Sequence, residues 1–213
     1  MESRLIASES QQASSPAMAA RDLDPDPVTA LRGWLEEAAQ ASPRPDAMLV
    51  ATSTTDGRPS ARVVLLRRLD ERGLVFFTNR TSRKGDELSD NPYAAVVFHW
   101  PELGRQVRVE GEVEDVGRDE SEAYWQSRPR ASRIAGWASP QSQPIEGRDE
   151  LDARYAEAEE RFADGDVPLP EFWGGYRVVP ASFEFWTHQE NRLHDRIHYV
   201  RTPDGWRRER LAP

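Results

Sequence analysis

Hydrophobic and polar residues alternate along much of this chain, and the alternation predicts a mainly β protein. Between residues 47 and 116, short runs rich in Val, Leu and Phe follow one another, at 47–54, 61–69, 74–79, 94–100 and 105–116. The segments TDGRPS (55–60) and DERG (70–73) between them have the composition and length of hairpin turns. Closely spaced strands joined by short turns indicate an antiparallel barrel or sandwich.

Helical spacing appears in three other segments. In 24–42 the apolar residues Val28, Leu31, Trp34 and Leu35 recur at helical intervals after two prolines. Segments 119–129 and 148–165 are also typical of helices, and the second is strongly charged and ends at Gly165. Strands return at 176–186, 192–201 and 205–213, so we expect one sheet system with helices packed on its outside.

The ends of the chain differ in character. Residues 1–24 are rich in Ser, Ala and Gln without a sustained period, which predicts a flexible N-terminal arm. Residues 25–213 are long enough to bury a real core, and we expect them to form a single domain.

The predicted strand at 192–201 carries an unusual pattern. Four basic side chains occupy alternate positions, namely Arg192, His194, Arg196 and His198. In a strand they would share one face, with Leu193, Ile197 and Tyr199 on the other. Because neighbouring like charges destabilise a sheet, the pattern predicts an anion over the basic face.

Composition limits the partners. The formal net charge of −9 argues against a nucleic-acid partner, since binding to a phosphate backbone needs a basic surface. The chain has no cysteine, which excludes disulfides and thiolate metal sites and is compatible with a cytoplasmic location. No apolar run approaches the roughly 20 residues that cross a bilayer, and none resembles a signal peptide, so we expect no membrane partner.

Several polar clusters are suited to phosphate. The stretch TNRTSRKGDEL follows a strand and opens a helix, so Thr78, Ser82, Arg83 and Lys84 would gather at a helix N-terminus, where anions are favoured. The alternative is a solvated turn whose basic residues pair with nearby Asp86 and Glu87.

Three weaker clusters have equally plain alternatives, either edge charges on a core strand or polar loops. Their residues are Arg62 and Arg67 in ARVVLLRRL, Tyr124, Ser127, Arg128, Arg130 and Ser132 in YWQSRPRAS, and Gln141 and Ser142 in ASPQSQP. The histidines have no accepted zinc spacing, so we expect no metal, and the sequence lacks GxSxG, GxxxxGK and GxGxxG motifs.

A set of longer strings carries a resemblance to a known family. ARVVLLRRLDERGLVFFTNRTSRKGDELSDNP, RQVRVEG, SRPRASRIAGWASPQS, PLPEFWGGYRV, EFW, RLHDR and the terminal RLAP resemble the pyridoxine/pyridoxamine 5'-phosphate oxidase family in order and spacing across residues 22–213. The resemblance implies a split β-barrel homodimer with two FMN molecules at the subunit interface.

The resemblance also implies site residues. FMN would contact Arg62, Val63, Val64, Leu65, Leu66, Phe77, Thr78, Ser82, Arg83, Lys84, Gln106, Gln141, Ser142, Trp186 and Arg196. Substrate would contact Arg67, Tyr124, Arg128, Ser132, Arg192, Leu193 and His194, with Arg192 and His194 as the catalytic candidates against the pyridine ring.

The implied reaction oxidises pyridoxine or pyridoxamine 5'-phosphate to pyridoxal 5'-phosphate, with O2 as acceptor and H2O2 as product. Two alternatives stay open: a related flavin oxidase acting on another ring, such as a phenazine precursor, and a non-catalytic flavin-binding module. The chain departs from the family pattern at Arg67, where some members have lysine, in THQEN (187–191), where many have a glycine-containing QGG run, and in the N-terminal arm.

Overall fold

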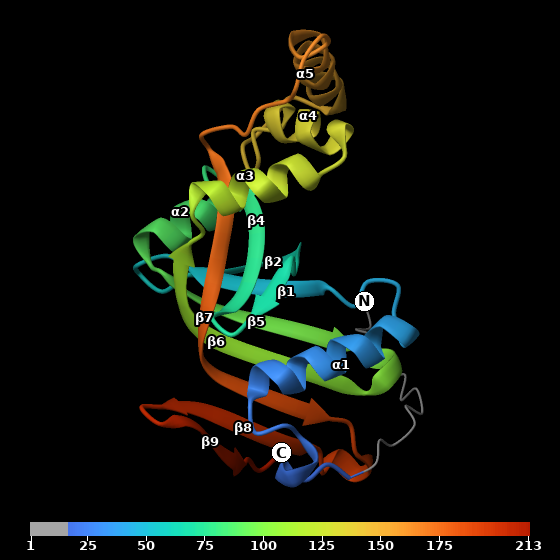
Figure 1. The fold of residues 1–213 in the computed structure, drawn as a ribbon, viewed down its shortest axis with the longest axis vertical. Helices are drawn as coiled ribbons and strands as arrows, with labels where there is room; N and C mark the ends of the chain where they lie inside the picture. The colour runs from blue at the N-terminus through green and yellow to red at the C-terminus, as the bar shows by residue number, and fades with distance from the viewer. Residues whose placement is uncertain (1–16) are drawn as a thin grey trace, which may run out of the picture. The chain divides into compact units, whose positions relative to one another are not determined.

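The computed structural model describes residues 17–213, shown in Figure 1. These residues contain a nine-stranded sheet with the order β2-β1-β5-β6-β7-β4-β3, and off this path β8 pairs with β7 and β9 pairs with β8. The chain divides into two compact units, one of residues 17–45, 98–108 and 183–213 and one of residues 46–97 and 109–182. We call them the terminal unit and the central unit.

The strands of the central unit follow the predicted ones closely. They comprise β1 (Ala47–Ser53), β2 (Pro59–Leu65), β3 (Arg68–Asp70), β4 (Gly73–Asn79) and parts of β5 (Tyr93–Trp100), β6 (Arg105–Asp115) and β7 (Trp173–Thr187). β1 pairs antiparallel with β2 and β5, and β4 pairs antiparallel with β3 and β7. In β1 the alternation buries Met48 and Val50, as period-two spacing requires.

The predicted strand 61–69 is interrupted in the structure. The Leu66 amide donates to the Asp46 carbonyl oxygen at 2.8 Å, and the Arg67 amide donates to the Val75 carbonyl oxygen at 2.8 Å. The chain therefore changes partner strand between β2 and β3, and Arg67 lies at the bend.

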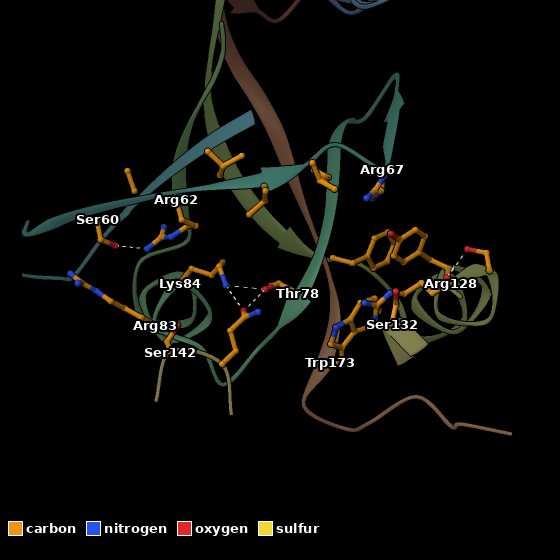
Figure 2. A pocket seen from close by; sticks show the side chains of 18 of the residues that line it. Ser60, Arg62, Arg67, Thr78, Arg83, Lys84, Arg128, Ser132, Ser142 and Trp173 are labelled. Carbon is orange, nitrogen blue, oxygen red and sulfur yellow. Dashed lines mark hydrogen bonds between the residues drawn. The ribbon is translucent and has the colours of Figure 1, made fainter. Parts of the chain in front are cut away.

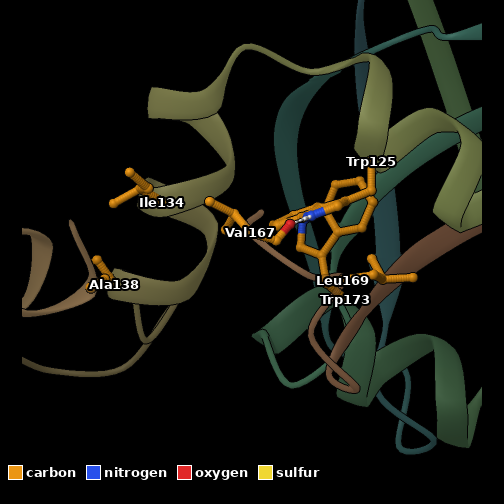
Figure 3. Close-up of a cluster of buried hydrophobic side chains, with 7 residues drawn as sticks. Trp125, Ile134, Ala138, Val167, Leu169 and Trp173 are labelled. Atoms are coloured by element: carbon orange, nitrogen blue, oxygen red, sulfur yellow. Dashed lines mark hydrogen bonds between the residues drawn. The ribbon is translucent and has the colours of Figure 1, made fainter. Parts of the chain in front are cut away.

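Four helices belong to the central unit: α2 (Arg83–Asp90), α3 (Arg118–Ser127), α4 (Arg130–Ala138) and α5 (Arg148–Arg161). Helix α4 was not expected from the sequence, because it follows α3 after a break of two residues with Pro129 as its N-cap. Figure 3 shows the core to which α3, α4 and α5 contribute, in which Trp125, Ile134, Val167 and Trp173 are buried. The Trp125 indole N–H donates to the Val167 carbonyl oxygen at 2.8 Å, which ties α3 to the segment after α5.

The terminal unit contains α1 (Pro27–Ala41), the short helices η1 (Ala20–Asp22), η2 (Pro101–Leu103) and η3 (Glu190–Arg192), and the antiparallel pair β8 (Asp195–Thr202) and β9 (Gly205–Arg210). Asp26 caps α1 by accepting the Thr29 amide at 3.0 Å. Of the expected apolar stripe, Val28, Leu31 and Trp34 are buried and Leu35 is half-buried. Trp34 packs edge-on against Phe185 at 5.0 Å between ring centres.

Part of the predicted flexible arm is packed. Met18 and Leu23 are buried, and the Met18 amide donates to Asp195 Oδ2 at 2.8 Å. Arg208 donates to the carbonyl oxygens of Ala20 and Leu23. The expectation of an arm therefore needs correction for residues 17–24, and its remainder lies outside the described residues.

Candidate functional site

One cleft of about 830 Å³ in the central unit collects most of the predicted ligand residues (Figure 2). Its lining includes, from the FMN set, Arg62, Val63, Val64, Leu65, Phe77, Thr78, Arg83, Lys84, Gln141 and Ser142, and from the substrate set, Arg67, Tyr124, Arg128 and Ser132. Segments from β2 to the loop after α4 thus converge on one cavity, although they are far apart in the sequence.

The cleft also has lining residues that sequence reasoning missed, namely Ser60, Ala61, Pro129 and Trp173, and it includes Ser127 of the predicted YWQSRPRAS cluster. Trp173 lies within the quoted string PLPEFWGGYRV, so the string was noticed but no role was assigned to it. Two predicted FMN residues of the central unit are absent from the lining. Leu66 lies at the bend after β2, and Ser82 is fully buried beneath the start of α2.

Lys84 is the central cation at one end of the cleft. Its ammonium group donates to Thr78 Oγ1 at 3.0 Å, Ser82 Oγ at 2.9 Å and Gln141 Oε1 at 2.6 Å. These partners are neutral oxygens, and the residue is only 7% exposed. Burial, together with the charge of Arg62, lowers the pKa of Lys84 to about 8.

The other basic residues at this end are already paired with a carboxylate. Arg83 Nε lies 2.8 Å from Glu87 Oε1, and Arg62 Nη2 lies 3.4 Å from Glu87 Oε2. Burial opposes ionisation of Glu87, yet hydrogen bonds from Ser60, Thr52 and Arg83 hold its pKa at about 2. Pairing within the turn, the alternative considered for this cluster, is thus correct for Arg83, whereas Lys84 keeps a buried positive charge that a ligand phosphate can neutralise. The residues at this end therefore fit the phosphate group of FMN.

The opposite end of the cleft is built on stacked aromatic rings. Tyr124 stacks on Phe77 with ring centres 4.1 Å apart and an interplanar angle of 13°, and Trp173 lies parallel to both. The Arg128 guanidinium carbon lies 5.0 Å from the Trp125 ring centre and 4.9 Å from that of Trp173. These aromatic faces hold the arginine by cation–π attraction.

Arg128 is a second cation without a carboxylate partner among the described residues. Its Nη1 atom is buried and has no hydrogen-bond acceptor within residues 17–213. Burial lowers the pKa of Arg128, and the positive charges of Arg67 and Arg133 lower it further, whereas Tyr124 raises it. Arg67, by contrast, lies 3.3 Å from Asp46 Oδ2. An anion bound between Arg67 and Arg128 would relieve this accumulation of positive charge.

The remaining predicted residues belong to the terminal unit and do not line the cleft. They are Gln106, Trp186, Arg192, Leu193, His194 and Arg196. The expected strand face of four alternating basic residues is wrong in its first half. Strand β8 begins only at Asp195, and Arg192 lies in η3 with a φ of 60°.

The second half of that pattern is a strand, and its charges are balanced within the protein. Arg196 donates through Nε and Nη2 to the two carboxylate oxygens of Glu184, each at 2.9 Å. His198 Nδ1 lies 3.2 Å from Glu209 Oε1 on β9. The anions that the alternation predicted are therefore, in part, carboxylates of neighbouring strands.

Comparison with known proteins identifies the family. The family model described as pyridoxamine 5'-phosphate oxidase matches residues 35–162, and that of the pyridoxine 5'-phosphate oxidase C-terminal dimerisation region matches residues 173–213. This chain belongs to the pyridoxine/pyridoxamine 5'-phosphate oxidase family. The family's oxidase from Rubrobacter xylanophilus is 54% identical over 89% of this chain and 88% of its own length. That from Myxococcus xanthus is 53% identical over 90% and 93%, respectively.

Solved structures agree with this family assignment. PhzG from Burkholderia lata, solved in complex with tetrahydrophenazine-1-carboxylic acid, superposes with a TM-score of 0.87 at 33% identity, covering 94% of this chain and 100% of that one. A pyridoxamine 5'-phosphate oxidase-related, FMN binding protein from Nostoc punctiforme shares the fold, with a TM-score of 0.68 at 20% identity over 85% of this chain and 97% of its own. The chain thus has the split-barrel fold of the oxidase family, as the sequence predicted.

The described residues also bear on membrane-spanning helices and metal sites. No helix within residues 17–213 is long and apolar enough to cross a membrane. In the same residues, no group of three or more His, Asp or Glu side chains is arranged to hold a metal ion.

Proposed function

We propose that this protein is an FMN-dependent oxidase that converts pyridoxine or pyridoxamine 5'-phosphate to pyridoxal 5'-phosphate, with O2 as acceptor and H2O2 as product. The observation that carries the proposal is a single cleft with a cationic group at each end. Lys84 with Arg62 and Arg83 lies at one end, and Arg67 with Arg128 and Ser132 lies at the other (Figure 2). Such a cleft suits two phosphorylated ligands, a flavin nucleotide and a phosphorylated pyridine.

The two ends have different tasks. Lys84, supported by Thr78, Ser82 and Gln141, binds the FMN phosphate. FMN, when bound, supplies the redox chemistry by accepting a hydride equivalent from the C4' carbon of the substrate and passing two electrons to O2. The chain's own residues bind and orient the two ligands and keep their phosphates apart.

At the substrate end, Arg67 and Arg128 bind the phosphate of the pyridine substrate. Tyr124 is held by its stacking on Phe77, so its hydroxyl group is directed by a rigid ring. Because the guanidinium of Arg128 rests on two indole faces and no carboxylate of residues 17–213 pairs with it, its charge is available to the substrate. The charge-assisted hydrogen bonds favour a phosphorylated over an unphosphorylated substrate.

The oligomer follows from the family. A match to the family's dimerisation region supports a homodimer. We place FMN at the dimer interface, and the 66% exposure of the apolar Val63 beside the cleft is consistent with a further surface covering it. Gln106, Trp186 and Arg196 remain proposed FMN ligands, and Arg192, Leu193 and His194 remain proposed substrate ligands.

In a decisive assay, pyridoxine phosphate and pyridoxamine phosphate are added separately to the FMN-loaded dimer in air, and pyridoxal 5'-phosphate and H2O2 are measured. We expect the two products in equal amounts. Tetrahydrophenazine-1-carboxylic acid is offered in parallel, because PhzG, which is similar to this chain, was solved in complex with it. Turnover of the phenazine precursor alone would replace the proposed function with that of the neighbour.

A further inference from the structure

The candidate catalytic residue His194 forms a cluster of three aromatic rings with Trp186 and His188 in the terminal unit. Its ring centre lies 4.6 Å from that of Trp186 and 5.2 Å from that of His188, and the rings of Trp186 and His188 are 6.2 Å apart. His188 belongs to the stretch THQEN, the part of the sequence that departs from the usual family pattern. The role of His188 is therefore not supplied by the family resemblance.

A backbone hydrogen bond fixes which nitrogen of His194 carries the proton. The Gln189 amide donates to His194 Nδ1 at 3.1 Å, so Nδ1 must be an unprotonated acceptor. The proton of the neutral ring then lies on Nε2. Protonation of Nδ1 would place two N–H groups against each other, and this hydrogen bond therefore disfavours the charged imidazolium.

The segment that supplies this hydrogen bond is anchored on both sides. The His188 amide donates to the Gly104 carbonyl oxygen at 2.7 Å. The side chain of Gln189 donates to Asp195 Oδ2 at 3.0 Å, and Asp195 also accepts from Arg210 and the Met18 amide. The Asp195 carboxylate, next to His194 in the sequence, thus accepts hydrogen bonds from other residues, and His188 and Gln189 are held beside the His194 ring.

The charged neighbours of His194 act in the same direction as the hydrogen bond. Burial, the facing imidazole of His188 and the guanidinium of Arg192 lower the pKa of His194. Two imidazoles at this separation repel each other when both are protonated. His188 thus contributes a second, removable reason for His194 to stay neutral.

We propose that His188 is a positioning residue that, with the Gln189 amide, holds His194 as a neutral hydrogen-bond donor through Nε2 towards an acceptor atom of the substrate ring. The proposal deepens the proposed function and rests on it for the identity of the substrate. The protonation state of His194 is a separate property that is measurable without turnover.

The test is an NMR titration of the imidazole resonances in the FMN-loaded protein and in His188→Phe, which keeps an aromatic ring but removes its charge. The chain has four histidines, so each resonance is assigned by one substitution. We expect the wild-type His194 to show the Nε2–H tautomer, and its pKa to rise by roughly 0.5 in His188→Phe, the size expected for one like charge at a solvated 5 Å separation. His198→Phe is the matched control, because His198 pairs with Glu209, and it should leave His194 unchanged.

The acid limb of the pH profile of kcat/KM should move upward with the His194 pKa in His188→Phe and stay in place in His198→Phe. If His188→Phe does not fold, His188→Asn is titrated instead. An unchanged His194 pKa, an equal change in the control, or a wild-type proton on Nδ1 would overturn the assignment of His188. If no vitamin B6 phosphate is turned over while the titration behaves as expected, the proposed function fails and the positioning role of His188 stands.

Discussion

The buried ammonium group of Lys84 should make FMN binding depend on pH in a defined direction. In the free protein, burial and the charge of Arg62 lower the pKa of Lys84 from its ordinary value of 10.5 to about 8. A phosphate beside it would stabilise the charged form, so binding above pH 8 requires the uptake of a proton. At pH 9 about one tenth of the free protein has this lysine charged, and FMN should then bind about tenfold more weakly than at pH 7.

Two substitutions at Lys84 distinguish the effect of its positive charge from the effect of its loss of a proton between pH 7 and 9. Lys84→Arg keeps a cation that does not titrate in this range, so its FMN affinity should stay level between pH 7 and 9. Lys84→Met removes charge-assisted hydrogen bonds that are typically worth about 1.5–3 kcal/mol each, which corresponds to roughly 10- to 150-fold weaker binding for the loss of one. Titration of the apoprotein with FMN, followed by quenching of flavin fluorescence, measures all three affinities.

The stability of the apoprotein should respond to pH with the opposite sign. Between pH 8 and 10.5 the unfolded chain keeps the Lys84 proton that the folded chain has released, so the contribution of Lys84 to the free energy of unfolding rises with pH. In Lys84→Arg this contribution should be absent. A level FMN affinity in the wild type, or the same pH slope in Lys84→Arg, would refute the assignment of Lys84 as the phosphate-binding cation.

Three further predictions follow from other contacts. Arg128→Met should raise KM for pyridoxamine phosphate at least tenfold in steady-state kinetics, while FMN occupancy stays unchanged. Arg133→Met, the control, removes a cation paired with Asp166 and should change KM little. Because its pKa is held at about 2, the Glu87 carboxylate contributes stability above about pH 4.5, and this contribution is lost as the pH falls towards 2. The free energy of unfolding, measured with urea between pH 7 and 4, should therefore fall less on acidification in Glu87→Gln than in the wild type. Gly85→Ala would place its methyl carbon 1.9 Å from a backbone oxygen and should cost about 2 kcal/mol or more of stability, whereas Gly33→Ala in α1 meets nothing within 4 Å and should be neutral or stabilising; thermal unfolding compares them.

Local patterns were sufficient to predict most strands. Period-two alternation located β1, β5 and β6 to within a few residues, because each of these strands has one buried face, whereas β4 was located from a short apolar run and is buried on both faces. The string TSRKG correctly indicated the start of a helix, since α2 begins at Arg83, and its binding of phosphate stays a prediction. The family resemblance then brought Arg67, Tyr124 and Gln141 to the same site, which spacing alone does not specify.

Other features depend on contacts between distant residues and had no local signal. Helix α4 is only nine residues long and starts directly after Pro129, so it looked like a polar loop. The partners of Arg196 and His198 are Glu184 and Glu209, which sheet pairing brings beside them. Likewise, the composition around Lys84 does not reveal that its partners are neutral while its arginine neighbours share one carboxylate.

The central claim, that the cleft brings a flavin and a phosphorylated pyridine together for redox chemistry, is tested most directly without O2. Pyridoxamine phosphate is added anaerobically to the FMN-loaded protein, and the visible absorbance of oxidised flavin is followed in a stopped-flow instrument. We predict that the absorbance is lost in a single turnover, with one pyridoxal 5'-phosphate formed per FMN after imine hydrolysis, and that it returns when O2 is admitted. Flavin that stays oxidised in a folded, FMN-loaded dimer saturated with either vitamin B6 phosphate would contradict the account.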